Sequence, residues 1–224
     1  MISRHARGEH LPRHRHAQGY VAVVLAGGYV EAGDGGRWSA RPGTVIVHGA
    51  HEAHRDAFDA GATVVLNLPP VDGLSPGAGL VDDIDAVARA AERDPREAIA
   101  LVAAHYRGGA HALADWPDRL AAALADDPAL ALGRWAEAAG LDPASVSRGF
   151  ARAYGVSPKR FRYEARARRA LGAVVTSRDG FATIAAAHGF ADQAHMTRAL
   201  AAITGIPPGA IRAKSVQAAA GPPR

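Results

Sequence analysis

Two segments of this chain, residues 129–155 and 181–205, repeat one order of residue types, and this repetition constrains the fold more than any other feature. In the first segment, apolar residues at helical spacing are followed by Gly140, then by a leucine, and then by Asp142 and Pro143. Glycine enters the left-handed turn that ends a helix at little cost, and Asp followed by Pro is typical of a helix start. The pattern therefore predicts two helices joined by a tight turn.

The second segment has the same order, with Gly189 at the end of a first helix and Asp192 at the start of the next. Each second helix carries an apolar stripe on one face and polar side chains on the other. One such helix pair is a weak signal, because any pair of packed helices imitates it. Two pairs in tandem predict two helix-turn-helix units.

The polar faces of the two second helices carry side chains that can read a DNA duplex. Arg pairs with guanine, Gln pairs with adenine, and Thr meets a base or a phosphate. Residues 117–224 hold 15 Lys and Arg against 8 Asp and Glu, whereas residues 1–116 hold 11 against 14. The alternative is that these side chains only solvate the helices or form surface ion pairs. The predicted DNA-binding residues are Ser145, Ser147, Arg148, Gln193, His195, Thr197 and Arg198.

Residues 117–213 resemble the AraC/XylS-type DNA-binding domain. The most specific pieces are Arg148-Gly149-Phe150, Gly155-Val156-Ser157-Pro158, Ile184-Ala185, Gly189-Phe190 and the ending from Thr204 to Arg212. The resemblance implies two helix-turn-helix units that are joined by a long helix over residues 157–176 and that place each second helix in the major groove of operator DNA. One departure is Gly149 inside the second helix of the first unit, where glycine costs about 1 kcal/mol relative to alanine. We call the second helix of each unit its reading helix.

The first 75 residues have a different texture, with short β-branched runs bounded by Gly and Pro. Tyr20–Leu25, Thr44–Val47 and Thr63–Leu68 are predicted strands. Several short strands at this spacing favour a small antiparallel barrel or sandwich.

Seven of the 11 histidines lie within residues 1–54. His14 and His16 point to one face of a strand, so they can converge with one residue of a later strand on a divalent metal ion. The stretch resembles a cupin sensor barrel, and this resemblance implies His54 as the third ligand, with His51 as the alternative. The glutamate that the resemblance leads us to expect is missing, because its place falls at Gly19 or Tyr20.

Two other readings of the histidines are that they line a pocket for an organic effector or lie on the barrel surface. His5 and His10 fall in a segment that we expect to be a mobile N-terminal arm.

The predicted fold class is α+β, with a small antiparallel cupin-like barrel followed by an all-α C-terminal domain. The expected boundaries are 1–75 for the sensor barrel, 76–116 for a linker and helical segment, 117–213 for the tandem helix-turn-helix domain and 214–224 for a flexible tail. The apolar faces of the helices between 81 and 107 need burial, either in a homodimer or against the barrel of the same chain.

These features predict a transcription regulator that binds double-stranded operator DNA and responds to a small-molecule or metal effector. The alternatives are a metal-dependent cupin enzyme and a non-specific architectural DNA-binding protein; we expect no enzymatic activity. The chain has no cysteine, and its N-terminus lacks the apolar run of a signal peptide. With no apolar stretch of about 18 residues, we expect a cytoplasmic protein without a membrane span.

Overall fold

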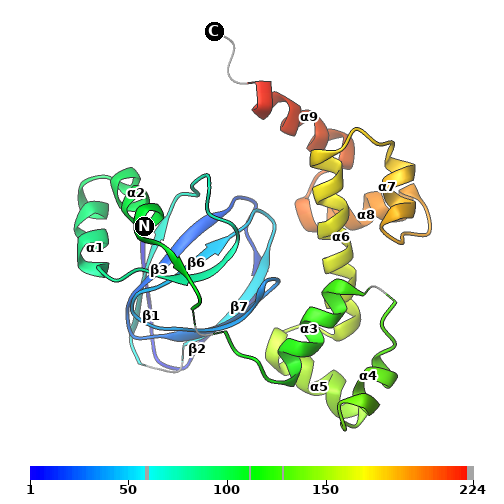
Figure 1. The fold of residues 1–224 in the computed structure, drawn as a ribbon, viewed down its shortest axis with the longest axis horizontal. Coiled ribbons are helices and arrows are strands. Elements are labelled where there is room, and N and C mark those ends of the chain that lie inside the picture. The colour runs from blue at the N-terminus through cyan, green and yellow to red at the C-terminus, as the bar shows by residue number, and fades with distance from the viewer. Residues whose placement is uncertain (59–60, 111, 128, 221–224) are drawn as a thin grey trace. The chain divides into compact units, whose positions relative to one another are not determined.

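The computed structural model describes residues 1–58, 61–110, 112–127 and 129–220 (Figure 1). The chain divides into two compact units. Unit 1 combines Met1–Arg119 with Ala144–Val156, and the segments Leu120–Pro143 and Ser157 onward form unit 2. The helix that follows the first tight turn therefore groups with the N-terminal strands.

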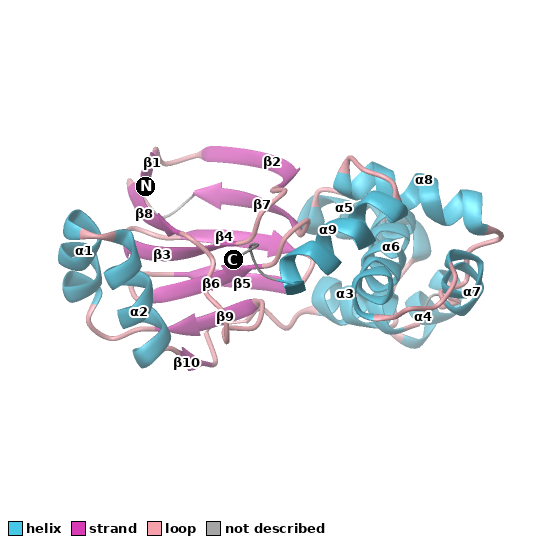
Figure 2. Ribbon diagram, turned by 90° about the horizontal axis from the view of Figure 1, so that it is seen from above, coloured by secondary structure: helices cyan, strands magenta, loops and turns pink. Residues whose placement is uncertain are grey.

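Unit 1 contains two antiparallel sheets, which together we call the β-domain (Figure 2). The six-stranded sheet has the spatial order β1 (Ile2–His5), β8 (Thr63–Leu68), β3 (Tyr20–Ala26), β6 (Thr44–His48), β9 (Gly77–Leu80) and β10 (Arg107–Gly108). The four-stranded sheet has the order β2 (Glu9–Arg15), β7 (Ala53–Phe58), β4 (Tyr29–Gly33) and β5 (Gly36–Ala40). The three predicted strands are confirmed as β3, β6 and β8, but the described strands form two sheets and no single closed barrel.

Strand β3 is buried on both of its faces, which explains its uninterrupted apolar run. Ala22 and Val24 belong to a core cluster with residues of both sheets, such as Ile46 and Phe58. The intervening Val21 and Val23 belong to a second cluster on the opposite face. The β-domain therefore has one core between its sheets and another outside the six-stranded sheet.

Helices α1 (Ile84–Arg93) and α2 (Pro95–His105) cover that outer face (Figure 2). Their buried residues, including Val87 and Val102, pack in the same cluster as the outward residues of β3. Helix α2 begins after Asp94, whose side chain accepts a hydrogen bond from the Arg96 backbone N–H. Of the two ways to bury these faces, the structure shows packing against the β-domain of the same chain.

The expectation of a mobile N-terminal arm is wrong. Strand β1 pairs with β8 from Ile2 to His5, and the His5 ring stacks on Phe58 with 4.0 Å between ring centroids. His10 lies in β2, which pairs with β7. The first residues of the chain pair because β8 offers them an edge, which no pattern within residues 1–10 reveals.

The C-terminal half is helical, as predicted. Its elements are α3 (Trp116–Asp126), α4 (Leu132–Ala138), α5 (Pro143–Tyr154), α6 (Pro158–Thr176), α7 (Phe181–Ala187), α8 (Gln193–Thr204) and α9 (Pro208–Ala220). Within unit 2, Ala170 and Val174 of α6 pack against Ile184 of α7 and Leu200 of α8. Among the described helices, none combines the length and the apolar character that a membrane crossing needs.

Candidate functional site

The two predicted tight turns have the same hydrogen bonds. After α4, Gly140 has φ +67°, and the Leu141 N–H donates to the Ala136 carbonyl at 2.9 Å. After α7, Gly189 has φ +70°, and the Phe190 N–H donates to the Ala185 carbonyl at 2.9 Å. Both turns are Schellman caps, in which a left-handed glycine closes the helix. The repeated order of residue types thus folds into a repeated turn.

The second reading helix, α8, starts as predicted, with the Asp192 carboxylate accepting from the His195 backbone N–H at 2.6 Å. Gln193 and Arg198 are exposed, and Thr197 is half-buried. The His195 ring lies edge-on to Phe190, with 5.2 Å between centroids. This packing leaves His195 half-buried, so its ring supports the turn of its own unit.

The first reading helix, α5, exposes Ser145 and Arg148, and Ser147 is half-buried. The Arg148 guanidinium donates to the Ser145 hydroxyl at 3.2 Å. The buried stripe of α5 is Val146, Phe150 and Tyr154. The Tyr154 hydroxyl donates to Asp118 within the same unit.

Gly149 fits against Trp116 within unit 1. A Cβ atom at position 149 would lie 2.5 Å from Cζ2 and 2.8 Å from Cη2 of the indole ring. Real Cβ atoms do not approach other atoms this closely. The glycine that looked costly in a helix is therefore needed for the indole to pack.

Polar contacts inside unit 1 hold α5 against the β-domain. The Arg55 guanidinium of β7 donates to the Arg152 carbonyl near the end of α5 at 2.5 Å. The Tyr154 hydroxyl donates to Asp118 Oδ1 at 2.9 Å, and Arg37 of β5 donates to the same carboxylate at 2.8 and 3.0 Å. Strands β5 and β7 thus contact the first reading helix, directly or through Asp118.

The pKa of Asp118 reflects this network. Burial alone raises the pKa of its carboxyl, but hydrogen bonds with Arg37, Asp115 and Tyr154 bring it below its ordinary value of 3.8. Asp118 is therefore charged at neutral pH and acts as the acceptor that joins β5, α3 and α5.

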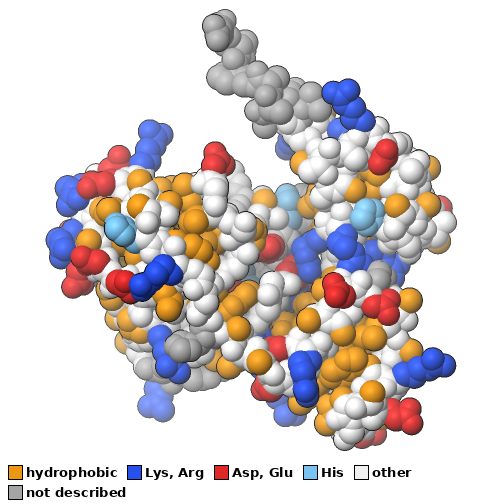
Figure 3. Space-filling view, in the orientation of Figure 1, with side chains coloured by type: hydrophobic (Ala, Val, Ile, Leu, Met, Phe, Trp, Pro, Cys, Tyr) orange, Lys and Arg blue, Asp and Glu red, His pale blue; other side chains and the backbone are white. Residues whose placement is uncertain are grey.

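Several arginines of α6 have structural partners inside unit 2. Arg162 donates to the Leu130 carbonyl at 2.7 Å, Arg166 donates to the Gly189 carbonyl at 2.9 Å, and Arg169 donates to the Ala125 carbonyl. Figure 3 shows Lys and Arg side chains gathered around the middle of α6. Part of the basic charge of this half therefore caps the ends of neighbouring segments.

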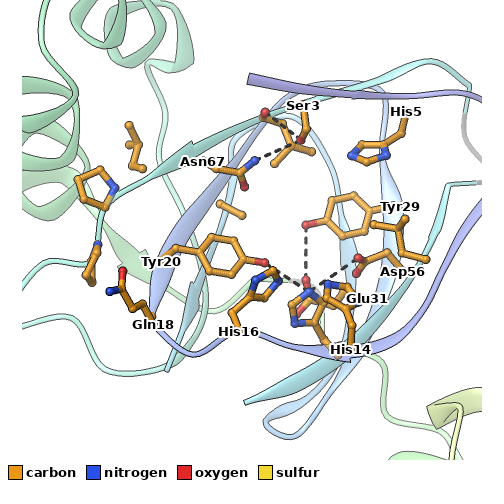
Figure 4. Close-up of a pocket in the computed structure, with 18 of the residues that line it drawn as sticks. Ser3, His5, His14, His16, Gln18, Tyr20, Tyr29, Glu31, Asp56 and Asn67 are labelled. Carbon is orange, nitrogen blue, oxygen red and sulfur yellow. Dashed lines mark hydrogen bonds and ion pairs between the residues drawn. The ribbon is translucent and has the colours of Figure 1, made fainter. Parts of the chain in front are cut away.

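The β-domain contains a cavity of about 660 Å³ that is open to the surface, shown in Figure 4. Its apolar lining includes Leu11, Tyr29, Phe58, Val65 and Leu68. Ser3 and Asn67 lie at one end, and a group of imidazoles and carboxylates lies at the other. A mostly apolar hollow with convergent polar groups is typical of a small-molecule site.

The predicted histidine triad comes together at this polar end. His14 of β2 pairs in register with His54 of β7, which places their ring centroids 4.3 Å apart. His16 follows β2, and the ligand atoms of the three side chains lie within 4.8 Å of one another. His14 Nδ1 lies 2.9 Å from the Pro12 carbonyl, so donation from Nδ1 leaves Nε2 free to bind a metal.

The charge state of these rings also fits a metal. Burial lowers the pKa of His54 well below 6.5, and the neighbouring imidazoles lower it further. Burial lowers the pKa of His48 to about 3. Both rings are therefore neutral at pH 7, which is the form that ligates d-block ions.

The alternative ligand His51 is not among the described residues that line the cavity. It lies in the turn before β7 with φ +64°, and its backbone N–H donates to the His16 carbonyl at 2.9 Å. The backbone of His51 therefore fixes the turn that leads into β7, the strand that carries His54.

Four polar residues near this end were not predicted as site residues. Tyr20, Glu31 and Asp56 line the cavity, and the His48 ring stacks on Tyr20 behind it. Tyr20 occupies the place where the cupin resemblance led us to expect a glutamate, and its hydroxyl lies 3.3 Å from His54 Nε2. Glu31 brings a carboxylate from β4 instead. Its position was not predictable, because only the pairing of β4 with β7 brings it beside His54.

Burial raises the pKa of both carboxyl groups at this end of the cavity. Burial raises the pKa of Asp56 to about 7, against a lowering by Arg55. Burial, followed by repulsion from Asp56, raises the pKa of Glu31 well above 4.5.

A family model described as a helix-turn-helix domain matches residues 135–214. No curated protein sequence matches the chain. Among solved structures, the chain is similar to the C-terminal domain of AraT, a response regulator from Geobacillus stearothermophilus, with 20% identity over 44% of this chain and 84% of that chain and a TM-score of 0.40. It is also similar to ToxT from Vibrio cholerae, with 8% identity over 96% of this chain and 97% of that chain and a TM-score of 0.44. A third similar structure is a transcriptional regulator with an AraC-type DNA-binding domain from Chromobacterium violaceum, at 24% identity, 39% and 79% coverage and a TM-score of 0.37.

Proposed function

We propose that this chain, a DNA-binding transcription regulator with an AraC-type helix-turn-helix domain at residues 135–214, changes its affinity for operator DNA when an effector enters the cavity of its β-domain. Two parts of the molecule enter this proposal: the reading helices and the cavity.

The proposed DNA contacts are the polar side chains on α5 and α8. Arg148 and Arg198 are exposed. Gln193 is the first residue of α8, and side chains at the start of this helix reach base edges in helix-turn-helix proteins. Thr197, Ser145 and Ser147 complete the proposed contact set with hydroxyl groups. His195 is proposed to contact the DNA backbone at most, because its ring packs on Phe190.

The proposed effector occupies the 660 Å³ cavity. An apolar middle with polar ends suits a small organic molecule. The triad of His14, His16 and His54 suits a divalent metal ion, either as the effector itself or as the anchor of an organic one. The imidazole and carboxylate donors favour Zn²⁺, Ni²⁺, Fe²⁺ or Cu²⁺ over hard cations such as Mg²⁺.

The observation that carries the proposal is the position of Arg55. It follows His54 directly in β7, so the two side chains point to opposite faces of the strand. His54 faces the cavity, and Arg55 donates to the end of α5. An effector that binds one arrangement of β7 more tightly than another will shift α5 with it.

Selection of bound DNA from a random pool tests the proposal, using the full chain with EDTA and with added Ni²⁺. We expect a recurrent operator sequence whose affinity differs between the two conditions if a metal is the effector. Equal affinity for selected and random DNA at physiological salt would contradict the proposal and favour a non-specific architectural protein. Light scattering on the selected complex counts the copies bound; we propose a homodimer on a two-site operator.

The contact between Arg55 and α5 can be tested separately. Arg55→Ala removes the contact with α5 and leaves every cavity ligand in place. We expect unchanged binding of the effector but a smaller difference in DNA affinity between the free and the bound protein. An undiminished difference would show that the signal does not pass through Arg55.

A further inference from the structure

Behind the polar end of the cavity lies a second set of metal-binding groups, of which Glu31 and His54 line the cavity and His48 does not. Glu31 of β4, His48 of β6 and His54 of β7 offer ligand atoms that lie within 4.8 Å of one another. Their exposed fractions are 2%, 7% and 3%, so the set is buried. His16 of the outer triad is exposed, which makes the second set the deeper of the two.

This deeper set contains polar atoms that lack a partner. In the described structure, His48 Nε2 and His54 Nδ1 are buried and have no hydrogen bond. The nearest acidic atom to His48 Nε2 is Glu31 Oε2 at 3.6 Å, which is beyond hydrogen-bond length. An unpaired buried polar atom costs about 1–3 kcal/mol and calls for an ion or a water as its explanation.

The set also contains a buried carboxyl group without a described basic partner. Among the described contacts of Glu31, the partners are Tyr29 and His48, and none is Lys or Arg. Asp56, 5% exposed, lies 3.8 Å from His54 Nε2 through its Oδ2 atom and leaves Oδ1 unpaired. Two buried carboxyl groups beside two neutral imidazoles favour a divalent cation between them.

We propose that Glu31, His48 and His54 form a second, deeper position for a divalent d-block metal ion, and that the two positions compete for one ion because they share His54. Carboxylate and imidazole ligands in this number suit Zn²⁺, Co²⁺ or Ni²⁺. A neutral imidazole binds one ion through one nitrogen while the other nitrogen carries its proton. Occupation of one position therefore excludes the other.

This inference rests on the proposed function only for the consequence of binding, which is that the ion would be the effector. The deeper position joins β4 and β6 to β7, whereas the outer position joins β2 to β7. An ion in either position would therefore bind β7, the strand that carries Arg55, but would connect it to different strands.

The test is titration of the full, tag-free chain with Co²⁺, followed by calorimetry and by visible absorption, without DNA. We expect one ion per chain. Glu31→Gln and His48→Gln should each weaken binding about tenfold and change the Co²⁺ spectrum to that of the outer position. His14→Gln should change the spectrum in the other direction, and His54→Gln should weaken binding at least 100-fold.

His5→Gln is the matched control, because His5 lines the same cavity but belongs to neither set; it should bind as the unaltered chain does. Thermal unfolding of each variant verifies that it is folded. Binding of two ions per chain would contradict the proposal that the two positions compete for one ion. Unchanged affinity and an unchanged spectrum in both Glu31→Gln and His48→Gln would contradict the existence of the deeper position. Because no DNA is present, these results are independent of whether the ion regulates DNA binding.

Discussion

At the scale of single residues, contacts outside a helix decide which residue the helix accepts. Gly149 is unfavourable for α5 considered alone, yet the Trp116 ring occupies the space that any side chain would need. His195 shows the converse case, since a residue predicted to read DNA packs its ring against Phe190 and Tyr163.

Replacing Gly149 with alanine should therefore destabilise the protein, although alanine is the better helix former. We expect a loss of about 1–3 kcal/mol from overpacking, measured by chemical unfolding. Gly172→Ala in α6 is the control, because nothing lies within 4 Å of a Cβ there, and it should stabilise by about 0.5–1 kcal/mol. A Gly149→Ala variant as stable as Gly172→Ala would show that the indole moves aside easily.

Arg198 is the residue whose removal best tests DNA reading. Arg198→Ala should weaken operator binding by about 1–3 kcal/mol and relax the preference at one base pair, as measured by titration of the selected operator and its point variants. Lys214→Ala removes the same charge from the exposed surface of α9 and should weaken binding less, without a change in base preference. If both variants behave alike, Arg198 contributes charge only.

At the scale of elements, the contacts of α5 show how one helix can serve two roles. Its exposed face carries Ser145 and Arg148, while its C-terminal turn is held by β7 and, through Asp118, by β5. The first reading helix is therefore attached to the domain that contains the cavity, and α8 packs with α6 and α7 in unit 2. This difference makes α5 the helix that the proposed effector would affect.

The acceptor role of Asp118 has a pH signature. Its pKa is below 3.8 in the folded protein, so its contribution is complete above the unfolded value and is lost as the pH falls through the folded value. We expect Asp118→Asn to cost roughly 1–2 kcal/mol at pH 7, after allowance for partial exposure. Urea unfolding from pH 2 to pH 7 should show that the difference between Asp118→Asn and the unaltered chain shrinks below about pH 3.8. A difference that is constant over this range would contradict the role of the charge.

At the scale of the whole molecule, the chain has two compact units, and the cavity lies in only one of them. Each unit has its own buried clusters, which is the usual condition for separate unfolding. Binding to the folded state of one unit stabilises that unit by a free energy that rises with the logarithm of the ligand concentration.

Scanning calorimetry should therefore show two unfolding transitions, and saturating Zn²⁺ should raise the midpoint of one of them. At 100 times the dissociation constant, the gain is about 2.7 kcal/mol. EDTA should reverse the shift. A single transition that moves as a whole would mean that the two units unfold together, and the absence of a shift would count against a metal in the cavity.

The sequence alone determined the local structure of the helical half, because its signals are local. Gly140, Gly189, Asp192 and the Pro residues at helix starts set the turns and caps within a few residues, and each was found where its pattern predicted. Short apolar runs bounded by turn residues likewise determined β3, β6 and β8.

Only the tertiary structure decided which residues meet. The pairing of β2 with β7 placed His14 beside His54, and the pairing of β4 with β7 added Glu31, although no spacing in the sequence indicates that carboxylate. The packing of α5 on the β-domain made Gly149 necessary and gave Arg55 its contact. The physical reason is that turns and caps depend on neighbours along the chain, whereas strand register and packing depend on segments tens of residues apart.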